Sequence, residues 1–229
     1  MPTHLVTGAG SGIGAETARR LSERGDRLVL LARSDERAAD LADAFPGAQT
    51  LVADLSDPER LAEALAGQSL PDRLDTLVHA AGVVELGAVA EQAVSAWRRT
   101  LDVNLVAAAE LTRLLLPALR EARGHVVFVN SGSGLRANPG WASYAASKFG
   151  LRGLADALRG EEGGNGVRVT SVYPGRVATP MQEKVHAHEG KEYDASEWIQ
   201  PGSVASTILV AIDLPRDAEV TDLTVRPTP

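Results

Sequence analysis

Tyr144 and Lys148 are the residues whose types and spacing most directly suggest chemistry in this 229-residue chain. They stand four positions apart in the run YAASK, so on a helix both side chains lie on one face. A tyrosine with its ordinary pKa of about 10 is a poor base at neutral pH, and a nearby ammonium lowers that pKa by favouring the phenolate. The chain has three lysines beside 20 arginines, yet a lysine stands here. The pair therefore predicts a tyrosine that transfers a proton.

Ser131 and Ser133 are candidate hydroxyl donors, because they follow a predicted strand in the run VNSGS. In an open α/β sheet the ligand crevice lies at the carboxyl ends of the strands. A hydroxyl there can donate a hydrogen bond to a carbonyl oxygen. A serine turn without chemistry is the alternative for both residues.

A glycine-rich turn, TGAGSGIG, follows the first predicted strand at residues 7–14. Glycines at such a turn let the backbone approach a pyrophosphate, and the helix that begins there supplies free N–H groups and a positive dipole end. We therefore expect Gly8, Ser11, Gly12, Ile13 and Gly14 to contact a dinucleotide. A flexible turn is the alternative, and the flanking strand and helix argue against it.

The residues after the second predicted strand indicate which ribose the dinucleotide carries. An acidic residue there would bind a free 2′-hydroxyl, whereas an arginine would bind a 2′-phosphate. The strand ends in Ala32, followed by Arg33 and Ser34, so NADP(H) is favoured as the cofactor. A solvated Arg33 with Asp35 nearby is the alternative, and it would leave NAD(H) in place.

Asp54 and Leu55 follow the third predicted strand. Their position suits the adenine end of the same cofactor. A polar strand end without a ligand is the alternative.

These residues need a sheet to hold them together. Seven apolar runs rich in Val and Leu predict strands at residues 5–7, 28–32, 50–53, 76–79, 126–130, 167–172 and 220–225. They mostly lack alternation of apolar and polar residues, as buried parallel strands do. Helices are predicted at 12–24, ending before Gly25, at 96–119 and at 144–159, and Ser56-Asp57-Pro58-Glu59 is typical of a capping box that opens another. The alternation predicts a single α/β domain over 1–229, with a Rossmann-like, doubly wound, seven-stranded parallel sheet flanked by helices on both faces.

Residues 181–200 interrupt this alternation with a long polar segment. Long loops in compact domains are often functional lids, so we expect this segment to cover the substrate. A mobile surface loop is the alternative.

Composition excludes several classes of protein. The net charge is −7 and no basic face is evident, which argues against a nucleic-acid partner. No apolar run approaches the roughly 20 residues that span a bilayer, and the first residues do not form a secretory signal. The chain has no cysteine, so it has no disulfide and no thiolate metal site. We expect a cytoplasmic protein with no membrane segment and no bound metal.

Taken together, the motifs resemble the short-chain dehydrogenase/reductase family, in its common branch with TGxxxGxG and YxxxK motifs, over roughly residues 5–225. Ser131 stands 13 residues before Tyr144, which matches the family spacing and favours it over Ser133. Asn104 stands 40 residues before Tyr144 and matches the asparagine of the family's catalytic tetrad. The run PGRVAT at 174–179 resembles the PGxxxT segment that holds the nicotinamide.

The resemblance implies an oxidoreductase that moves a hydride between nicotinamide and a carbonyl or alcohol carbon. Tyr144 would then transfer the proton and Ser131 would polarise the substrate oxygen. Lys148 would bind the nicotinamide ribose and lower the pKa of Tyr144, and Asn104 would hold a water that links Lys148 to solvent. In the PGxxxT segment, the contacts to the nicotinamide would come from Pro174, Gly175, Val177 and Thr179.

Two departures from the family pattern stand out. The family's NNAG is His79-Ala80-Ala81-Gly82 here, so the small residues Ala80, Ala81 and Gly82 still let the cofactor pass, while a sheet-stabilising asparagine is missing. We expect His79 to be a buried structural histidine. The chain is also shorter than is usual for this branch, near the lid and the C-terminal end.

The substrate is expected to be a small carbonyl or alcohol compound of moderately apolar character. This expectation rests on the candidate pocket residues Val83, Ser133, Leu135, Trp141, Arg176, Met181 and Trp198.

A homodimer or homotetramer is also expected, because the family usually pairs through the two long helices. In this chain both helices carry more apolar residues than one sheet-facing stripe requires. The alternatives are an NAD(H)-dependent alcohol dehydrogenase of the same family and a non-catalytic dinucleotide sensor, against which the complete tetrad argues.

Overall fold

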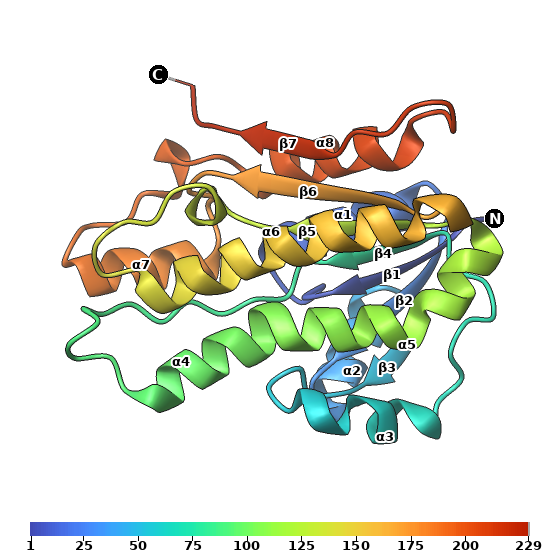
Figure 1. The fold of residues 1–229 in the computed structure, drawn as a ribbon, viewed down its shortest axis with the longest axis horizontal. Helices are drawn as coiled ribbons and strands as arrows, with labels where there is room; N and C mark the ends of the chain where they lie inside the picture. Colours follow the sequence, from blue (N-terminus) through green and yellow to red (C-terminus); the bar gives the residue numbers. More distant parts are fainter. Residues whose placement is uncertain (229) are drawn as a thin grey trace.

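The computed structural model describes residues 1–228 and contains one seven-stranded parallel sheet covered by helices on both faces (Figure 1). The strands are β1 (Thr3–Thr7), β2 (Arg27–Ala32), β3 (Gln49–Val52), β4 (Thr76–His79), β5 (His125–Val129), β6 (Arg168–Pro174) and β7 (Asp222–Val225). Their order in the sheet is β3-β2-β1-β4-β5-β6-β7, and every pair is parallel. The predicted Rossmann-like fold is confirmed, and each predicted strand lies within two residues of its observed position.

Eight α-helices connect and cover the strands within the described residues. They are α1 (Gly12–Glu23), α2 (Asp35–Ala44), α3 (Leu61–Ala66), α4 (Val94–Leu101), α5 (Ala107–Ala122), α6 (Ala142–Glu162), α7 (Pro180–Glu189) and α8 (Pro201–Asp213). Short 3₁₀ turns lie at Pro58–Arg60, Gly132–Gly134, Gly163–Asn165 and Ala195–Glu197, and a π-helical turn lies at Asp102–Val106.

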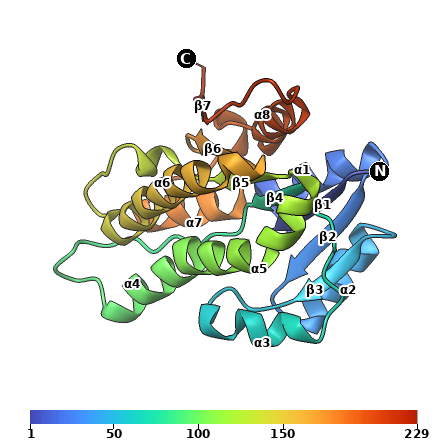
Figure 2. The same ribbon diagram turned by 45° about the vertical axis from the view of Figure 1, so that its right-hand side comes forward.

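Two apolar layers hold the helices against the sheet. On one face, α3, α5 and α6 pack against side chains such as Leu5, Leu77 and Phe128. On the other face, α1, α2 and α8 pack against strand side chains such as Val6 and Val78, which directly follow Leu5 and Leu77 in the sequence. Successive strand residues point to opposite faces, so a strand buried on both sides is apolar at nearly every position. Figure 2 shows the α5–α6 layer on one side of the strands and α1 and α8 on the other.

The strand order reverses between β1 and β4. From β1 the chain adds β2 and β3 on one side, and from β4 it adds β5, β6 and β7 on the other side. Ligands of open parallel sheets bind at the carboxyl ends of the strands at such a point. In Figure 1 the arrowheads of β6 and β7 point to the end of the molecule where α4 and α7 lie. The fold therefore places the binding site at that end.

Three predictions about helices need correction. The capping box at residues 56–59 is not formed, because Ser56 donates its hydroxyl to Asp54 and Asp57 precedes a 3₁₀ turn without a side-chain cap. The helix predicted at 96–119 is divided by the π-helical turn, which separates α4 from α5. The segment 181–200 is not a loop throughout, because its first nine residues belong to α7, which Thr179 caps through the amide of Gln182 and which has Pro180 in its first turn.

Candidate functional site

One cleft of about 1780 Å³ lies across the carboxyl ends of β1 to β7. Nearly all of the residues predicted for cofactor and substrate line it. Three predicted residues do not: Gly14, Ser34 and Asn104. Leu135 and Trp198, which we expected to line the substrate pocket, also lie outside it.

The glycine-rich turn forms the part of the cleft wall between β1 and α1. A Cβ on Gly8 would lie 2.8 Å from the amide nitrogen of Ala81, and one on Gly12 would lie 2.9 Å from the methyl carbon of Thr179. Both glycines have positive φ, 71° and 55°. Side chains would therefore fill the space where the backbone of α1 meets the segment after β6, and glycine keeps that space open.

The N-terminus of α1 can receive an anion. Ser11 is its N-cap residue, but its side chain does not cap the helix, and the first turn contains no acidic residue. The first N–H groups of the helix therefore point into the cleft without a side-chain acceptor. A dinucleotide pyrophosphate fits this turn, and Ser11, Gly12 and Ile13 would hold it.

Arg33, which follows β2, and Arg37, in the first turn of α2, bring two guanidinium groups to the cleft. Arg33 is exposed, and no carboxylate in residues 1–228 lies within ion-pair distance of it, Asp35 included. Ser34 accepts a hydrogen bond from the amide of Arg37 at 3.4 Å and so caps α2. Sequence reasoning missed Arg37, whose Nη2 lies 2.9 Å from the place of a Cβ on Gly10.

Asp54 and Leu55 line the cleft beside these arginines. The Asp54 carboxylate accepts hydrogen bonds from the amide and hydroxyl of Ser56, at 2.9 and 2.8 Å. These bonds fix the turn after β3.

The segment after β4 is tied to β1 through a single hydroxyl. Thr7 Oγ1 accepts hydrogen bonds from the amides of Ala80 and Ala81, at 3.1 and 3.0 Å. This contact holds the two strands together where the family's asparagine is missing. His79 is buried, stacks on Phe128 and lies 2.9 Å from Thr112 Oγ1. Burial lowers the pKa of His79 to about 3, so it stays neutral, as expected for a structural histidine.

Tyr144 and Lys148 lie on one face of α6 at the floor of the cleft, and both are buried. Lys148 Nζ lies 5.8 Å from the centre of the Tyr144 ring and donates a hydrogen bond to the carbonyl of Val129 at 3.0 Å. Burial lowers the pKa of Lys148 to about 8. Burial raises the pKa of Tyr144, and the Ser131 side chain acts in the opposite direction. The net shift is therefore opposite to the expected lowering, because desolvation outweighs the groups that favour the phenolate, and Tyr144 carries its proton at neutral pH.

Ser131 ends the segment after β5 and begins a 3₁₀ turn. Its amide donates to Asn130 Oδ1 at 2.9 Å, and its own Oγ accepts from the amide of Ser133 at 3.1 Å. Asn130 in turn donates to the carbonyl of Lys148 at 3.2 Å. This short network fixes Ser131 relative to α6, which carries Tyr144.

Asn104 lies in the π-helical turn and is buried. Its side chain bonds both backbone groups of Val83, at 2.8 and 2.9 Å, and donates to Ser147 Oγ at 3.0 Å. A Cβ on Gly82 would lie 3.3 Å from Asn104 Oδ1 and 3.9 Å from Lys148 Nζ. The side chain of Asn104 therefore connects the segment after β4 with α6, close to Lys148.

The segment after β6 meets the other walls through Thr179. The Thr179 hydroxyl donates to the carbonyl of Val177 at 3.2 Å, and its methyl group faces Gly12. Pro174, Gly175 and Val177 also line the cleft. The segment therefore crosses from the sheet to α7 in front of the glycine-rich turn.

One side of the cleft is formed in part by α7, which is held by an arginine between two tryptophans. Arg176 Cζ lies 5.9 Å from the centre of the Trp141 ring and 5.5 Å from that of Trp198, and its guanidinium pairs with both carboxylate oxygens of Glu189 at 2.5 and 3.0 Å. This ion pair lowers the pKa of Glu189 to about 2. His186 packs against Trp198 with ring centres 5.0 Å apart. We call Arg176, Glu189, Trp141 and Trp198 the latch; it fastens α7 to the loop before α6.

Two further features bear on what the site could hold. No group of three His, Asp or Glu side chains in residues 1–228 is arranged to bind a metal ion. No helix in that part of the chain is long and apolar enough to cross a membrane.

Comparison with known proteins places this fold and cleft in one family. The family model described as short chain dehydrogenase matches residues 2–190. An uncharacterised short-chain type dehydrogenase/reductase of Sinorhizobium fredii is 36% identical over 98% of this chain and 90% of that protein. The chain therefore belongs to the short-chain dehydrogenase family of oxidoreductases.

Solved structures agree with this assignment. A short-chain dehydrogenase/reductase family oxidoreductase from Burkholderia thailandensis is 33% identical, with a TM-score of 0.84 over 98% of this chain and 91% of that one. A serine dehydrogenase in complex with NADP⁺ is 26% identical, with a TM-score of 0.85 over 97% and 94%.

Proposed function

We propose that this protein is an NADP(H)-dependent oxidoreductase that transfers a hydride between nicotinamide and the carbonyl or alcohol carbon of a small substrate. The observation that carries the proposal is that Ser131, Tyr144 and Lys148 lie together in the cleft that the glycine-rich turn also lines. A neutral, buried tyrosine beside a serine hydroxyl and an ammonium suits proton transfer to a carbonyl oxygen.

The cofactor, when bound, supplies the hydride and takes it back in the reverse reaction. In reduction, Tyr144 donates its hydroxyl proton to the substrate oxygen, on which Ser131 donates a hydrogen bond. Lys148 holds the nicotinamide ribose and, as an ammonium, stabilises the tyrosinate that remains. Asn104 fixes the wall beside Lys148 through Val83 and Ser147, so its side chain positions that lysine.

The preference for NADP(H) is supported by Arg33 and Arg37. A guanidinium forms paired, charge-assisted hydrogen bonds with a phosphate, whereas NAD(H) would leave Arg33 solvated. Arg37 is already paired with Asp40 at 2.6 Å, so Arg33 is the stronger ligand of the two. The similar serine dehydrogenase was solved with NADP⁺.

The direct test is consumption of NADPH by the purified protein with a panel of ketones, aldehydes and oxo acids, followed by absorbance at the nicotinamide band. Turnover of any member with NADPH at a higher kcat/KM than with NADH supports the proposal. Binding of NADPH without turnover of any carbonyl or alcohol would contradict it.

We further propose that the protein acts in the cytoplasm as a homodimer or homotetramer paired through α5 and α6. Phe149, on α6, is an exposed aromatic side chain that such pairing would cover. Light scattering at micromolar concentration is expected to give a multiple of 24.1 kDa. A particle of that mass alone would contradict it.

A further inference from the structure

The cleft is strongly cationic although the chain is acidic. Nine of its lining side chains are Lys or Arg and two are Asp, whereas the whole chain has a net charge of −7. Charges gathered in a cleft with low-dielectric walls attract ligands of the opposite sign. The anionic cofactor is one such ligand, and it would bind some of these cationic side chains.

Five of the nine already have a role or a partner. Arg33 and Arg37 face the adenosine end, and Lys148 belongs to the proposed catalytic group. Arg99 is paired with Glu85, and Arg176 with Glu189. Within residues 1–228, no carboxylate lies within ion-pair distance of the remaining four, Arg98, Arg136, Lys184 and Arg226.

Two of these four adjoin the turn that carries Ser131. The Nη1 atom of Arg226 lies 2.6 Å, and its Cζ 3.4 Å, from the place of a Cβ on Gly132, the residue next to Ser131. The Arg136 amide donates to the carbonyl of Gly132 at 3.0 Å, so Arg136 is on the same turn. Both side chains are exposed to the cleft. An exposed guanidinium thus lies over the backbone beside the proposed oxyanion donor.

The sheet order separates Arg226 from the phosphates of the cofactor. Arg33 follows β2 and Arg226 follows β7, which stands five strands away in the sheet. At a strand spacing of about 4.8 Å, these strand ends are roughly 24 Å apart, and the glycine-rich turn after β1 is roughly 19 Å from β7. Arg226 therefore belongs to the substrate end.

We propose that the substrate is an oxo or hydroxy acid, whose carboxylate is bound by Arg226 with Arg136 while its carbonyl or alcohol oxygen faces Ser131 and Tyr144. The inference rests on the proposed function, and it replaces the moderately apolar substrate expected from the sequence. A planar guanidinium binds a carboxylate through two parallel hydrogen bonds, which also orients the acid. The reaction remains a hydride to carbon and a proton from Tyr144 to oxygen.

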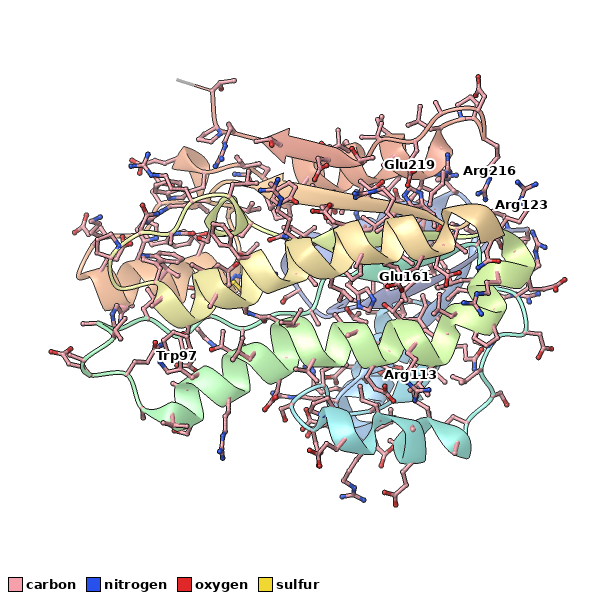
Figure 3. All side chains as sticks on the ribbon, viewed as in Figure 1. Trp97, Arg113, Arg123, Glu161, Arg216 and Glu219 are labelled. Atoms are coloured by element: carbon pink, nitrogen blue, oxygen red, sulfur yellow. The ribbon has the colours of Figure 1, made fainter. Side chains whose placement is uncertain are left out.

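The experiment compares an acid with its neutral ester on the same skeleton, acetoacetate with methyl acetoacetate and levulinate with methyl levulinate, for wild type and Arg226→Ala. Losing a charged hydrogen-bond partner is expected to lower kcat/KM for the preferred acid about 10- to 100-fold and to leave its ester unchanged. Arg226→Lys is expected to restore part of the loss. Arg216→Ala is the control of equal charge change, since Arg216 lies at the opposite end of the molecule from the cleft (Figure 3).

A second measurement does not depend on turnover. Succinate, which has no ketone or aldehyde group to reduce, is titrated calorimetrically into the protein saturated with NADPH. Wild type and Arg216→Ala are expected to bind it, and Arg226→Ala to bind it about 10- to 100-fold more weakly.

The outcomes separate this inference from the proposed function. Turnover of the acid that Arg226→Ala leaves unchanged would overturn the anion site and keep the oxidoreductase. Succinate binding that depends on Arg226, without turnover of any acid or ester, would keep the anion site and reject the oxidoreductase. Equal losses of kcat/KM for acid and ester in Arg226→Ala would show a structural role for Arg226 and overturn the inference, whether or not the oligomer dissociates. The absence of succinate binding in wild type would also overturn it.

Discussion

The cofactor half of the cleft, after β1 to β4, is lined mainly by glycine, alanine and backbone amides, with arginines at its far end. The substrate half, after β5 to β7, is lined by the serine turn, Trp141 and cationic side chains. In the proposed function, the first half binds the pyrophosphate of the cofactor through backbone groups and one helix N-terminus, so the sequence pattern of that turn is short and continuous. The second half is assembled from side chains up to about half the chain apart. The binding mode of the cofactor half can therefore be shared by many proteins, while that of the substrate half varies.

The largest expected effect lies where the two halves meet. Tyr144→Phe removes the proton donor and keeps the ring, so turnover is expected to fall by about two to four decades, the usual contribution of general acid catalysis. NADPH affinity, measured by fluorescence titration, is expected to stay the same. Tyr173→Phe is the matched control, since Tyr173 is buried in β6 and does not line the cleft. Near-normal turnover by Tyr144→Phe would remove Tyr144 from the mechanism.

The next effect tests whether the halves act separately. Arg33→Ala is expected to weaken NADPH binding about 10- to 100-fold through loss of a charge-assisted contact, and to leave NADH binding unchanged. The ratio of acid to ester turnover should not change, because Arg33 is at the far end of the sheet from Arg226. Adding Ala32→Asp is expected to favour NADH further by repelling the phosphate. Tighter binding of NADH than of NADPH by wild type would contradict the cofactor assignment.

Most of the cofactor half could be predicted from the sequence because its determinants are local. The run at residues 7–14 specifies the turn, and Arg33 follows directly after β2. Arg37 was missed because its role depends on how α2 leans over Gly10, which a strand-end rule does not describe. The pKa of Tyr144 was predicted with the wrong sign, since spacing shows a nearby charge but does not show how completely both groups are desolvated.

The substrate half could be predicted only in outline. Arg226 lies 95 residues from Ser131 in the chain, and only the packing of β7 brings its side chain over Gly132. Trp198 was placed in the pocket, but it packs behind Arg176 instead. Segment 181–200 contains polar residues on every side of a helix, so its periodicity gave no indication of α7.

A smaller effect concerns Lys148 and pH. Its pKa of about 8 means that the free protein loses this charge above pH 8, whereas a bound anionic cofactor favours the charged form. NADPH affinity is therefore expected to fall by about tenfold between pH 7 and 9, and Lys148→Met is expected to remove this dependence. Folding stability depends on pH in the opposite direction. Between about pH 8 and 10.5 the unfolded chain keeps a proton on Lys148 that the folded protein has lost, so the free energy of unfolding increases, and the folded state becomes more stable, as pH rises through that window. Affinity that is constant across this range in wild type would contradict the assigned pKa.

The smallest expected effect is on the latch. Glu189→Gln weakens the pair with Arg176, so we expect a loss of about 1 kcal/mol in stability and faster limited proteolysis within residues 190–200. Because the pKa of Glu189 is lowered from 4.5 to about 2, its contribution is complete above pH 4.5 and is lost as pH falls through about 2. Glu63→Gln breaks a solvent-exposed pair with Arg60 and serves as the control. Equal proteolysis of the two variants would show that the ion pair does not hold α7.

The π-helical turn at Asp102–Val106 has a consequence for how this chain tolerates insertions and deletions. A π turn contains about one residue more than an α turn, and each residue of a helix advances the next by about 100°. Deleting a single residue within 102–106 would let α4 and α5 merge into one regular helix without disturbing either apolar stripe much in composition. It would also swing Asn104 about 100° away from Ser147 or remove it altogether. We therefore expect insertions and deletions of single residues to be selected against here far more strongly than substitutions at most neighbouring surface positions. The length of this turn sets the position of Asn104 relative to α6.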